Sequence, residues 1–287
     1  MFSIPKLTLG TYLMHGEQLT NAVDEALRIG YRSFDTARFY ENEKELGDAL
    51  EMLLPKYNLV SSDIYVITKL FPLPVGGGNS NPEIIEQQVR ESLKNLGRSY
   101  IDLLLIHYPR PFENSDLDPS NPETRRIIWK KLENLKNSGI IRNLGVSNYE
   151  SRHIEEIRAY SSLVPAVNQV EYHPHFQRGE LRDYCRSRGI QFQAFSPLGR
   201  QNAQLLKDPE ILKISEKLQK PVAWIILRWA VQNGVGVVSK SITPSRLAQN
   251  FEATVGTDFV LGPEEMRILN GLNRDSPYVE DNGWLSI

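Results

Sequence analysis

The sequence has few of the features that mark secreted, disulfide-bonded or membrane proteins. Cys185 is the only cysteine among 287 residues, so no intramolecular disulfide forms, as is typical of a reducing compartment. No window approaches the run of about 18 apolar residues that spans a bilayer. The start of the chain, Met1 to Leu7, lacks the continuous apolar segment of a secretory signal.

The charged residues show no excess of either sign. Lys and Arg total 33, Asp and Glu total 35, and the net charge is −2 at pH 7. Without a basic stripe or an acidic tail, nucleic acids and anionic membranes are poor partners. We therefore expect a soluble, cytoplasmic protein that binds neither nucleic acid nor membrane.

A glycine-rich phosphate loop is also missing from the start of the chain. No G-x-G-x-x-G pattern follows the first predicted strand, although an open, doubly wound sheet usually carries one there. The cluster Gly76 to Gly78 follows the third predicted strand in a proline-rich loop and has no Walker lysine. We interpret it as a flexible connection, and the open sheet stays as the alternative architecture.

The chain does contain a regular alternation of short apolar runs and amphipathic stretches. Runs typical of buried parallel strands lie at 7–12, 31–35, 64–69, 101–107, 140–146, 166–171, 190–195 and 235–240. Stretches with helical periodicity lie at 17–29, 41–54, 82–96, 121–138, 150–160, 179–188, 208–232 and 244–254. Eight strands alternating with eight helices, without a linker, predict a single-domain (β/α)8 TIM barrel over residues 1–287.

Proline and glycine mark the predicted helix boundaries. Asn81-Pro82 and Asn121-Pro122 each predict a helix start, with asparagine as the cap and proline in the first turn. Glycine accepts the left-handed conformation that ends helices. The predicted helix ends are Gly30, Gly97, Gly139, Gly189 and Gly234.

Four titratable residues of different types lie at the carboxyl ends of consecutive predicted strands: Asp35, Tyr40, Lys69 and His107. In a parallel barrel these strand ends meet in one pocket. A phenol becomes a useful general acid when its pKa is lowered toward neutrality, and Lys69 is the candidate cation that lowers it. Asp35 would pair with the buried Lys69, while His107 would hydrogen-bond and orient a substrate carbonyl. The pattern favours Tyr40 as a proton donor.

Other interpretations of these residues stay open. Each alone has a structural explanation, as a packed loop tyrosine, a solvated lysine, a helix cap or a core histidine. Lys69 at a barrel strand end could also attack a carbonyl carbon, as in a Schiff-base aldolase. His173 and His175 have no further ligand cluster, so no metal is expected. Cys185 is predicted to be an inert thiol.

Sequence motifs follow one another in a fixed order along nearly the whole chain. They are Gly30–Glu43, Thr68–Leu70, Asp102–His107, Gly145–Asn148, Asn168–Pro174 and Lys240–Arg246. Together they resemble the aldo-keto reductase family. The resemblance implies a barrel in which Asp35, Tyr40, Lys69 and His107 form a catalytic tetrad. It also implies a nicotinamide cofactor that binds across the barrel mouth without a Rossmann unit.

By this resemblance, residues at later strand ends and in the loop that follows 190–195 bind the nicotinamide and pyrophosphate parts of the cofactor. They are Ser147, Asn148, Gln169, Phe195, Ser196 and Leu198. The polar strand-end side chains suit hydrogen bonds to a carboxamide, although Asn148 could instead cap the following helix. Phe195 keeps a flat face for stacking on the ring, and the loop at 196–198 folds over the pyrophosphate.

The segment Lys240–Asn250 indicates which dinucleotide binds. A strand end supplies Lys240 and hydroxyl groups, Pro244 opens a helix whose N-terminus favours an anion, and Arg246 lies in its first turn. Such a cationic cradle suits a dianionic 2′-phosphate, so NADPH is favoured over NADH. The residues implied are Lys240, Ser241, Thr243, Arg246 and Asn250, the last reaching the adenine edge. The alternative is a capped surface helix with two solvated cations.

The substrate side is expected to be aromatic. By resemblance, Tyr12, Phe71 and Tyr108 match pocket positions, and the stretch from Tyr278 to Ile287 corresponds to a loop that sets substrate choice. We predict a monomeric, NADPH-dependent enzyme that reduces an aldehyde or ketone to the alcohol, with hydride from the nicotinamide and a proton from Tyr40. The alternative is a cofactor-sensing or structural barrel protein with little turnover.

Overall fold

The strands of the protein close into a barrel. The computed structural model describes residues 3–73, 82–256, 258–279 and 286. Within these residues, eight parallel strands pair in chain order, and β8 returns to pair with β1. The strands are β1 (Leu7–Gly10), β2 (Ser33–Asp35), β3 (Tyr65–Leu70), β4 (Ile101–Ile106), β5 (Ile141–Ser147), β6 (Val167–Glu171), β7 (Gln191–Phe195) and β8 (Gly236–Ser239). The predicted (β/α)8 fold class is confirmed.

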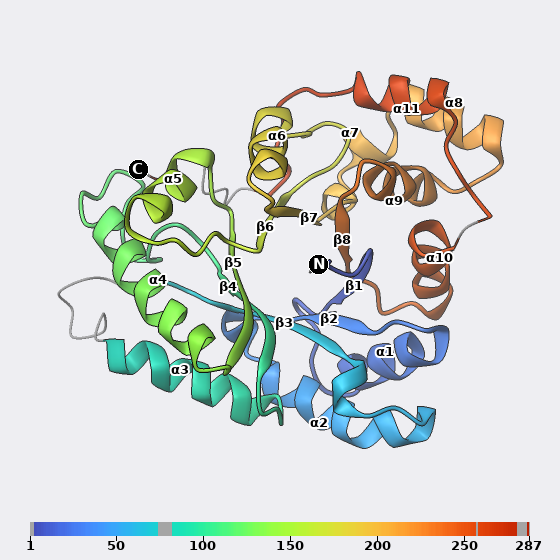
Figure 1. Cartoon of the computed structure of the whole chain (residues 1–287). Helices are drawn as coiled ribbons and strands as arrows, with labels where there is room; N and C mark the ends of the chain where they lie inside the picture. The colour runs from blue at the N-terminus through green and yellow to red at the C-terminus, as the bar shows by residue number, and fades with distance from the viewer. Residues whose placement is uncertain (1–2, 74–81, 257, 280–285, 287) are drawn as a thin grey trace.

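Helices surround the strands on the outside of the barrel (Figure 1). The longer ones are α1 (Gly16–Ile29), α2 (Glu43–Leu53), α3 (Pro82–Asn95), α4 (Asn121–Asn137), α5 (Ser151–Tyr160), α6 (Gly179–Ser187), α8 (Pro209–Leu218), α9 (Val222–Gln232), α10 (Pro244–Thr254) and α11 (Pro263–Asn270). The short ones are η1 (Arg38–Tyr40), η2 (Leu54–Tyr57), η3 (Ser61–Asp63), η4 (Gly199–Gln201) and α7 (Ala203–Leu206). In the part of the chain described, none is long and apolar enough to cross a membrane.

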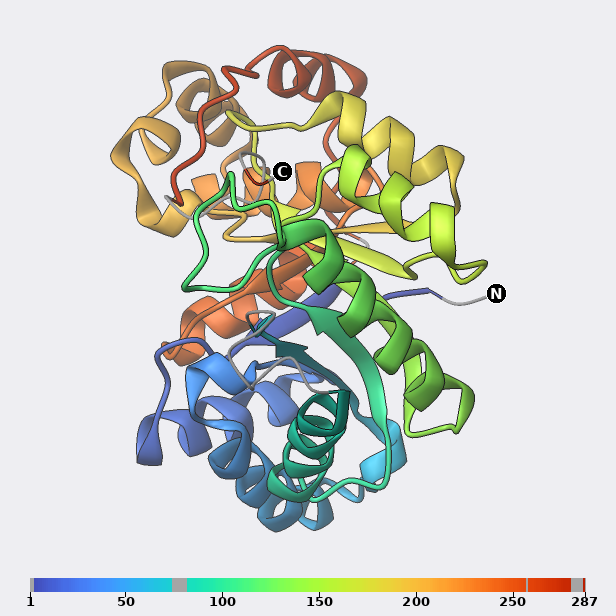
Figure 2. The ribbon, with the colours of Figure 1, turned by 90° about the vertical axis from the view of Figure 1, so that its left-hand side faces the viewer.

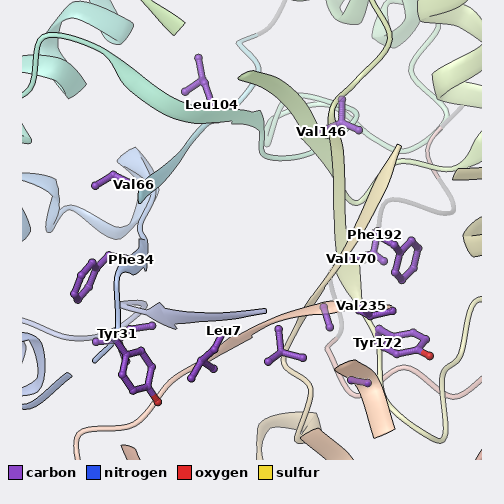
Figure 3. Close-up of a cluster of buried hydrophobic side chains, with 14 of the residues drawn as sticks. Leu7, Tyr31, Phe34, Val66, Leu104, Val146, Val170, Tyr172, Phe192 and Val235 are labelled. Atoms are coloured by element: carbon purple, nitrogen blue, oxygen red, sulfur yellow. The ribbon is translucent and has the colours of Figure 1, made fainter. Parts of the chain in front are cut away.

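Buried apolar side chains form two layers, because successive residues of a strand point to opposite faces. Phe34, Val66 and Leu104 point away from the barrel interior toward the surrounding helices (Figure 3). A smaller cluster fills the barrel itself and consists of Ile67, Leu103, Leu105 and Val167. Strands with both faces buried explain why the apolar runs in the sequence are nearly continuous.

The longest predicted helix, residues 208–232, is wrong as a single element. The structure divides it into α8 and α9. Gln219 ends α8 in the left-handed region with a φ of 51°, and Pro221 caps the start of α9. Proline lacks an N–H and disfavours helical geometry in the residue before it, so a continuous helix does not pass this point. Helices α7 and α11 lie where no helix was predicted.

The helix ends predicted from glycine agree with the structure better than the helix starts predicted from asparagine. All five predicted terminal glycines have positive φ, and Gly30 caps α1 with its N–H bonded to the Ala26 carbonyl oxygen. Asn121 lies inside α4 because Ser120 occupies the cap position. The other predicted cap, Asn81, and the glycine cluster at 76–78 lie outside the described residues.

All strand carboxyl ends face one side of the barrel, because the strands are parallel. In Figure 2 the green loop between β4 and α4 lies on the left, at this side. The segment that leads into β1 enters from the right, at the opposite end. Polar groups at the carboxyl ends therefore share one opening, which we call the mouth.

Candidate active site

The four predicted titratable residues meet at the mouth. Asp35 is the last residue of β2, Lys69 lies one residue before the end of β3, and His107 follows β4 directly. Tyr40 ends η1, the short 3₁₀ helix after β2. Because β2, β3 and β4 are neighbours in the barrel, the fold brings together side chains that are far apart in the sequence.

The ammonium group of Lys69 connects two of the other residues. Its Nζ lies 2.5 Å from Asp35 Oδ1, 3.1 Å from the Thr36 carbonyl oxygen and 3.4 Å from Tyr40 Oη. Lys69 is 1% exposed and Asp35 is 2% exposed. A buried lysine is costly unless it is paired and hydrogen-bonded, so Asp35 and the Thr36 carbonyl hold the charge beside the phenol.

A buried asparagine fixes the loop that carries Tyr40. Asn42 Oδ1 accepts a hydrogen bond of 2.7 Å from the Thr36 hydroxyl group. Its Nδ2 donates to the carbonyl oxygens of Thr11, at 2.8 Å, and Met14, at 3.0 Å. Asn42 thus ties the loops after β1 and β2 together, two residues beyond the phenol. It stands in the Gly30–Glu43 motif, but its role was not predicted.

The direction of the Tyr40 pKa shift differs from the prediction. Burial raises the pKa of the Tyr40 phenol by more than the neighbouring Lys69 cation lowers it. Burial also opposes the charge of Lys69, but Asp35 and the phenol outweigh it and raise the pKa of Lys69 overall. The expectation of a lowered tyrosine pKa is therefore wrong for this structure. Since the phenol stays protonated at neutral pH, it is held in the form that donates a proton.

His107 faces the same phenol as a neutral ring. Its ring centroid lies 5.7 Å from that of Tyr40, at an interplanar angle of 77°. Burial, together with the Lys69 charge, lowers the pKa of His107 well below its usual range. Its Nδ1 is buried without a hydrogen-bond partner among the described residues. A neutral imidazole keeps one N–H donor, which suits a hydrogen bond to a carbonyl oxygen.

Polar side chains at the ends of β5 and β6 form the predicted carboxamide site. Ser147 Oγ donates to the Gln169 carbonyl oxygen at 2.8 Å, and Asn148 Nδ2 donates to the His107 carbonyl oxygen at 3.0 Å. Asn148 does not cap α5, because Glu150 occupies that position. Within the described residues, its buried Oδ1 has no hydrogen-bond partner. An N–H donor from a bound carboxamide would satisfy this atom, so the site fits a nicotinamide.

The loop after β7 borders the mouth. Phe195, Ser196 and Leu198 are all partly exposed, and Ser196 adopts a φ of 46°. A backbone hydrogen bond of 2.8 Å from Gly199 N–H to the Ser196 carbonyl oxygen closes the turn. The guanidinium of Arg200 then lies 5.7 Å from the ring centroid of Tyr12, a residue of the loop after β1. This loop therefore reaches across toward the tetrad.

The predicted phosphate cradle lies where β8 leads into α10. Lys240, Thr243 and Arg246 are exposed, and in the described part of the chain neither cation forms an ion pair with a carboxylate. Although Lys240 is exposed, desolvation of its ammonium group by the surrounding protein lowers its pKa. Ser241 Oγ instead accepts the Thr243 N–H at 3.1 Å and shapes the turn. Two unpaired cations beside a helix N-terminus fit a phosphate group.

Asn250 differs from its neighbours in the cradle, because its side chain already has a partner. It is 5% exposed, and its Nδ2 donates a hydrogen bond of 3.0 Å to Ser239 Oγ. The structure therefore uses this amide nitrogen to join α10 to the end of β8.

Aromatic rings at the mouth, including those predicted for the substrate side, lie beside the tetrad. Tyr12 lies 4.9 Å from Tyr40, and Phe71 lies 5.4 Å from His107 and 6.0 Å from Tyr108, between ring centroids. Two rings that were not predicted join them, and both lie against Phe71. They are Phe39, 55% exposed, and Phe112, 70% exposed. The position of Phe39 next to Tyr40 was a signal available in the sequence, whereas the contact of Phe112 with Phe71 became evident only from the structure.

The remaining histidines and the cysteine have structural partners. His173 Nε2 lies 3.0 Å from Glu171 Oε1, and His175 Nε2 lies 3.0 Å from Asp208 Oδ2. In the described ranges, no three His, Cys, Asp or Glu residues are arranged to hold a metal. Cys185 is buried, which raises the pKa of its thiol to about 12. Of the predicted C-terminal loop, residues 280–285 and 287 lie outside the described residues.

A closed barrel with an acid–base cluster at its mouth defines a class of enzyme, and comparison with known proteins names the family. The model of the Aldo/keto reductase family matches residues 6–274. The human protein Aldo-keto reductase family 1 member A1 is 37% identical over 294 residues, covering 96% of this chain and 88% of the relative. The chicken protein of the same name gives the same figures.

Solved structures give the same result. The aldose reductase from Schistosoma japonicum has a TM-score of 0.84 and 34% identity, covering 96% of this chain and 90% of its own. The aldo-keto reductase MGS-M4, from a Medee basin deep-sea metagenome library, has a TM-score of 0.84 and 33% identity, covering 98% and 95%. This chain belongs to the aldo/keto reductase family, which is a family of oxidoreductases.

Proposed function

We propose that this protein reduces an aldehyde or ketone to the alcohol with NADPH. The observation that carries the proposal is the position of Lys69 Nζ, which contacts Asp35 at 2.5 Å and Tyr40 Oη at 3.4 Å. A buried cation beside a protonated phenol stabilises the negative charge that develops when the phenol gives up its proton. Family membership supports the same reaction class.

Each tetrad residue has one part in this reaction. When bound, the dinucleotide supplies a hydride to the carbonyl carbon. Tyr40 Oη donates its proton to the carbonyl oxygen, and Lys69 stabilises the phenolate that forms. Asp35 keeps Lys69 charged, and neutral His107 donates a hydrogen bond that orients the carbonyl oxygen. The rings of Phe39, Phe71 and Phe112 would exclude water from the reacting carbonyl.

The cofactor residues divide by the part of the dinucleotide that they would hold. We propose that Ser147, Asn148 and Gln169 bind the carboxamide, that Phe195 stacks on the ring, and that the loop with Ser196 and Leu198 covers the pyrophosphate. Lys240 and Arg246, which form no ion pair with a carboxylate of the described residues, lie beside the N-terminus of α10 and favour a 2′-phosphate and hence NADPH over NADH. We also propose that residues 1–287 form one domain that acts as a monomer.

A single substitution tests the proposal. Tyr40→Phe removes the proton donor and keeps the ring, so NADPH oxidation with an aldehyde should fall by about 100- to 10,000-fold. The dissociation constant for NADPH, measured by fluorescence, should change little. Tyr57→Phe is the matched control, because this phenol hydrogen-bonds Asp24 away from the mouth. Near-wild-type turnover in Tyr40→Phe would refute the proposal that Tyr40 donates the proton in carbonyl reduction.

The substrate range and the alternative function can be tested together. A panel of aromatic aldehydes, aliphatic aldehydes, α-dicarbonyls, sugars and ketones, each assayed by NADPH oxidation, should show a preference for apolar carbonyl compounds. Tight NADPH binding without turnover of any compound would instead favour a cofactor-sensing or structural barrel protein.

A further inference from the structure

A hydrogen-bonded pair of glutamines lies beneath the proposed carboxamide site. Strands β6 and β7 are neighbours in the barrel (Figure 1). Gln169 in β6 pairs in register with Gln193 in β7. Gln169 Nε2 donates to Gln193 Oε1 at 2.9 Å and to Asp35 Oδ2 at 2.9 Å. All three residues are at most 2% exposed. A buried chain of polar groups therefore runs from β7 through β6 to the tetrad carboxylate.

The chemistry of these partners determines which way the Gln169 amide points. An ionised carboxylate only accepts hydrogen bonds, so the amide nitrogen of Gln169 must face Asp35. Its second N–H is taken by the carbonyl oxygen of Gln193. With both N–H groups occupied, the amide oxygen points away from them, and among the described residues none donates to it.

A neighbouring side chain presents the same kind of atom. Asn148 Nδ2 donates to the His107 carbonyl oxygen and to Ser147 Oγ, which leaves its buried Oδ1 without a partner in the described ranges. The backbone N–H of Asn148 bonds the Gln169 carbonyl oxygen, so the two residues are adjacent. Two amide oxygens on adjacent residues, neither of which accepts a hydrogen bond from the described residues, match a ligand that brings an NH2 group.

The side chain of Gln193 contains a buried hydrogen-bond donor that is not satisfied by the described residues. This donor is its Nε2. Leaving a buried donor unsatisfied costs about 1–3 kcal/mol, so an apolar side chain of similar size would be favoured here on stability alone. The contact that Gln193 does make is the one to Gln169.

We propose that Gln193 is a positioning residue that holds the Gln169 amide with its oxygen free, so that Gln169 and Asn148 together accept the NH2 group of a primary carboxamide. The inference rests on the proposed function, because that carboxamide belongs to the nicotinamide ring. It adds a residue that does not touch the cofactor itself. Fixing the carboxamide also fixes the ring face that is turned to the substrate.

The test compares two cofactors in three variants. NADP+ carries the NH2 group, whereas in its acetylpyridine analogue a methyl group replaces it. The dissociation constant of the analogue divided by that of NADP+ therefore measures recognition of NH2. Gln193→Met removes the acceptor at similar volume and should lower this ratio by about 3- to 10-fold, the value of one neutral hydrogen bond. Gln193→Glu keeps an acceptor oxygen and should preserve the ratio.

Gln191→Leu is the matched control. It removes a glutamine from the same strand whose Oε1 accepts a hydrogen bond from the Ile4 N–H, toward the opposite end of the barrel. The control should keep the wild-type ratio. An unchanged ratio in Gln193→Met, or an equal loss in Gln191→Leu, overturns the inference while leaving the proposed function intact. Failure of the wild-type protein to bind NADP+ overturns both.

Discussion

The buried ion pair between Lys69 and Asp35 allows stability and activity to be separated. Lys69→Met replaces the ammonium group with an apolar side chain of similar length. It leaves Asp35 buried, with Gln169 Nε2 as its remaining side-chain donor among the described residues. The loss in free energy of unfolding in Lys69→Met therefore measures the penalty of burying a carboxylate without its ammonium partner.

The expected magnitude follows from this burial. Breaking a fully buried pair on one side costs about 3–5 kcal/mol, because the remaining charge is uncompensated. With a urea dependence of about 3 kcal/mol per molar, the unfolding midpoint should fall by about 1–1.7 M. The double variant Asp35→Asn/Lys69→Met removes both charges and should regain at least half of this loss.

Urea unfolding at pH 7 measures the stability, and NADPH oxidation with an aldehyde measures the activity. Both Lys69 variants should lose turnover, because Lys69 is the group that lowers the pKa of Tyr40 against burial. The control Lys213→Met breaks an exposed pair with Glu210 and should cost at most about 1 kcal/mol. If the double variant is as unstable as Lys69→Met, the unpaired carboxylate is not the main cost and the reasoning is refuted.

Two further predictions follow from the cradle and from a buried histidine. Lys240→Met and Arg246→Ala should each weaken NADPH binding by about 10- to 100-fold and leave NADH binding unchanged. The control Lys94→Met, in α3, should bind NADPH as tightly as the wild type. Equal losses for both dinucleotides would contradict the cradle. Burial, with nearby arginines, lowers the pKa of His153 to about 3 in the folded state. As the pH falls below about 6.5, His153 therefore becomes protonated in the unfolded state but not in the folded state, and the free energy of unfolding falls. His153 should contribute up to about 1.4 kcal/mol per pH unit between pH 6.5 and 4.5, and urea titrations of His153→Asn should lack that part of the slope.

Local patterns predicted the elements best where one physical cause dominates. Strands buried on both faces must be apolar, so the eight runs stood out in the sequence. The break at Pro221 was missed because the amphipathic pattern continues on both sides of it. Helix α7 has only four residues, too few for a periodic pattern, whereas α11 carries a start signal, Pro263 followed by Glu264 and Glu265, that was missed.

The candidate site was predicted in its residues but not in its electrostatics. Side chains at the carboxyl ends of adjacent parallel strands must meet, so Asp35, Tyr40, Lys69 and His107 could be grouped without coordinates. The sign of the Tyr40 pKa shift could not, because it depends on how far water is excluded around one oxygen atom. The assigned roles of the site residues stay predictions until the variants are measured.

By itself, the order of residues determined a parallel barrel with an acid, a phenol, an ammonium and an imidazole at one mouth. Those follow from periodicity and strand direction, which are local. Only the tertiary structure decided that burial raises the pKa of the phenol, that Phe39 and Phe112 join the aromatic wall, and that Gln169 donates a hydrogen bond to Gln193. Each of these depends on distances and burial between segments far apart in the chain, where the free energy of a charge or a hydrogen bond is set by what surrounds it.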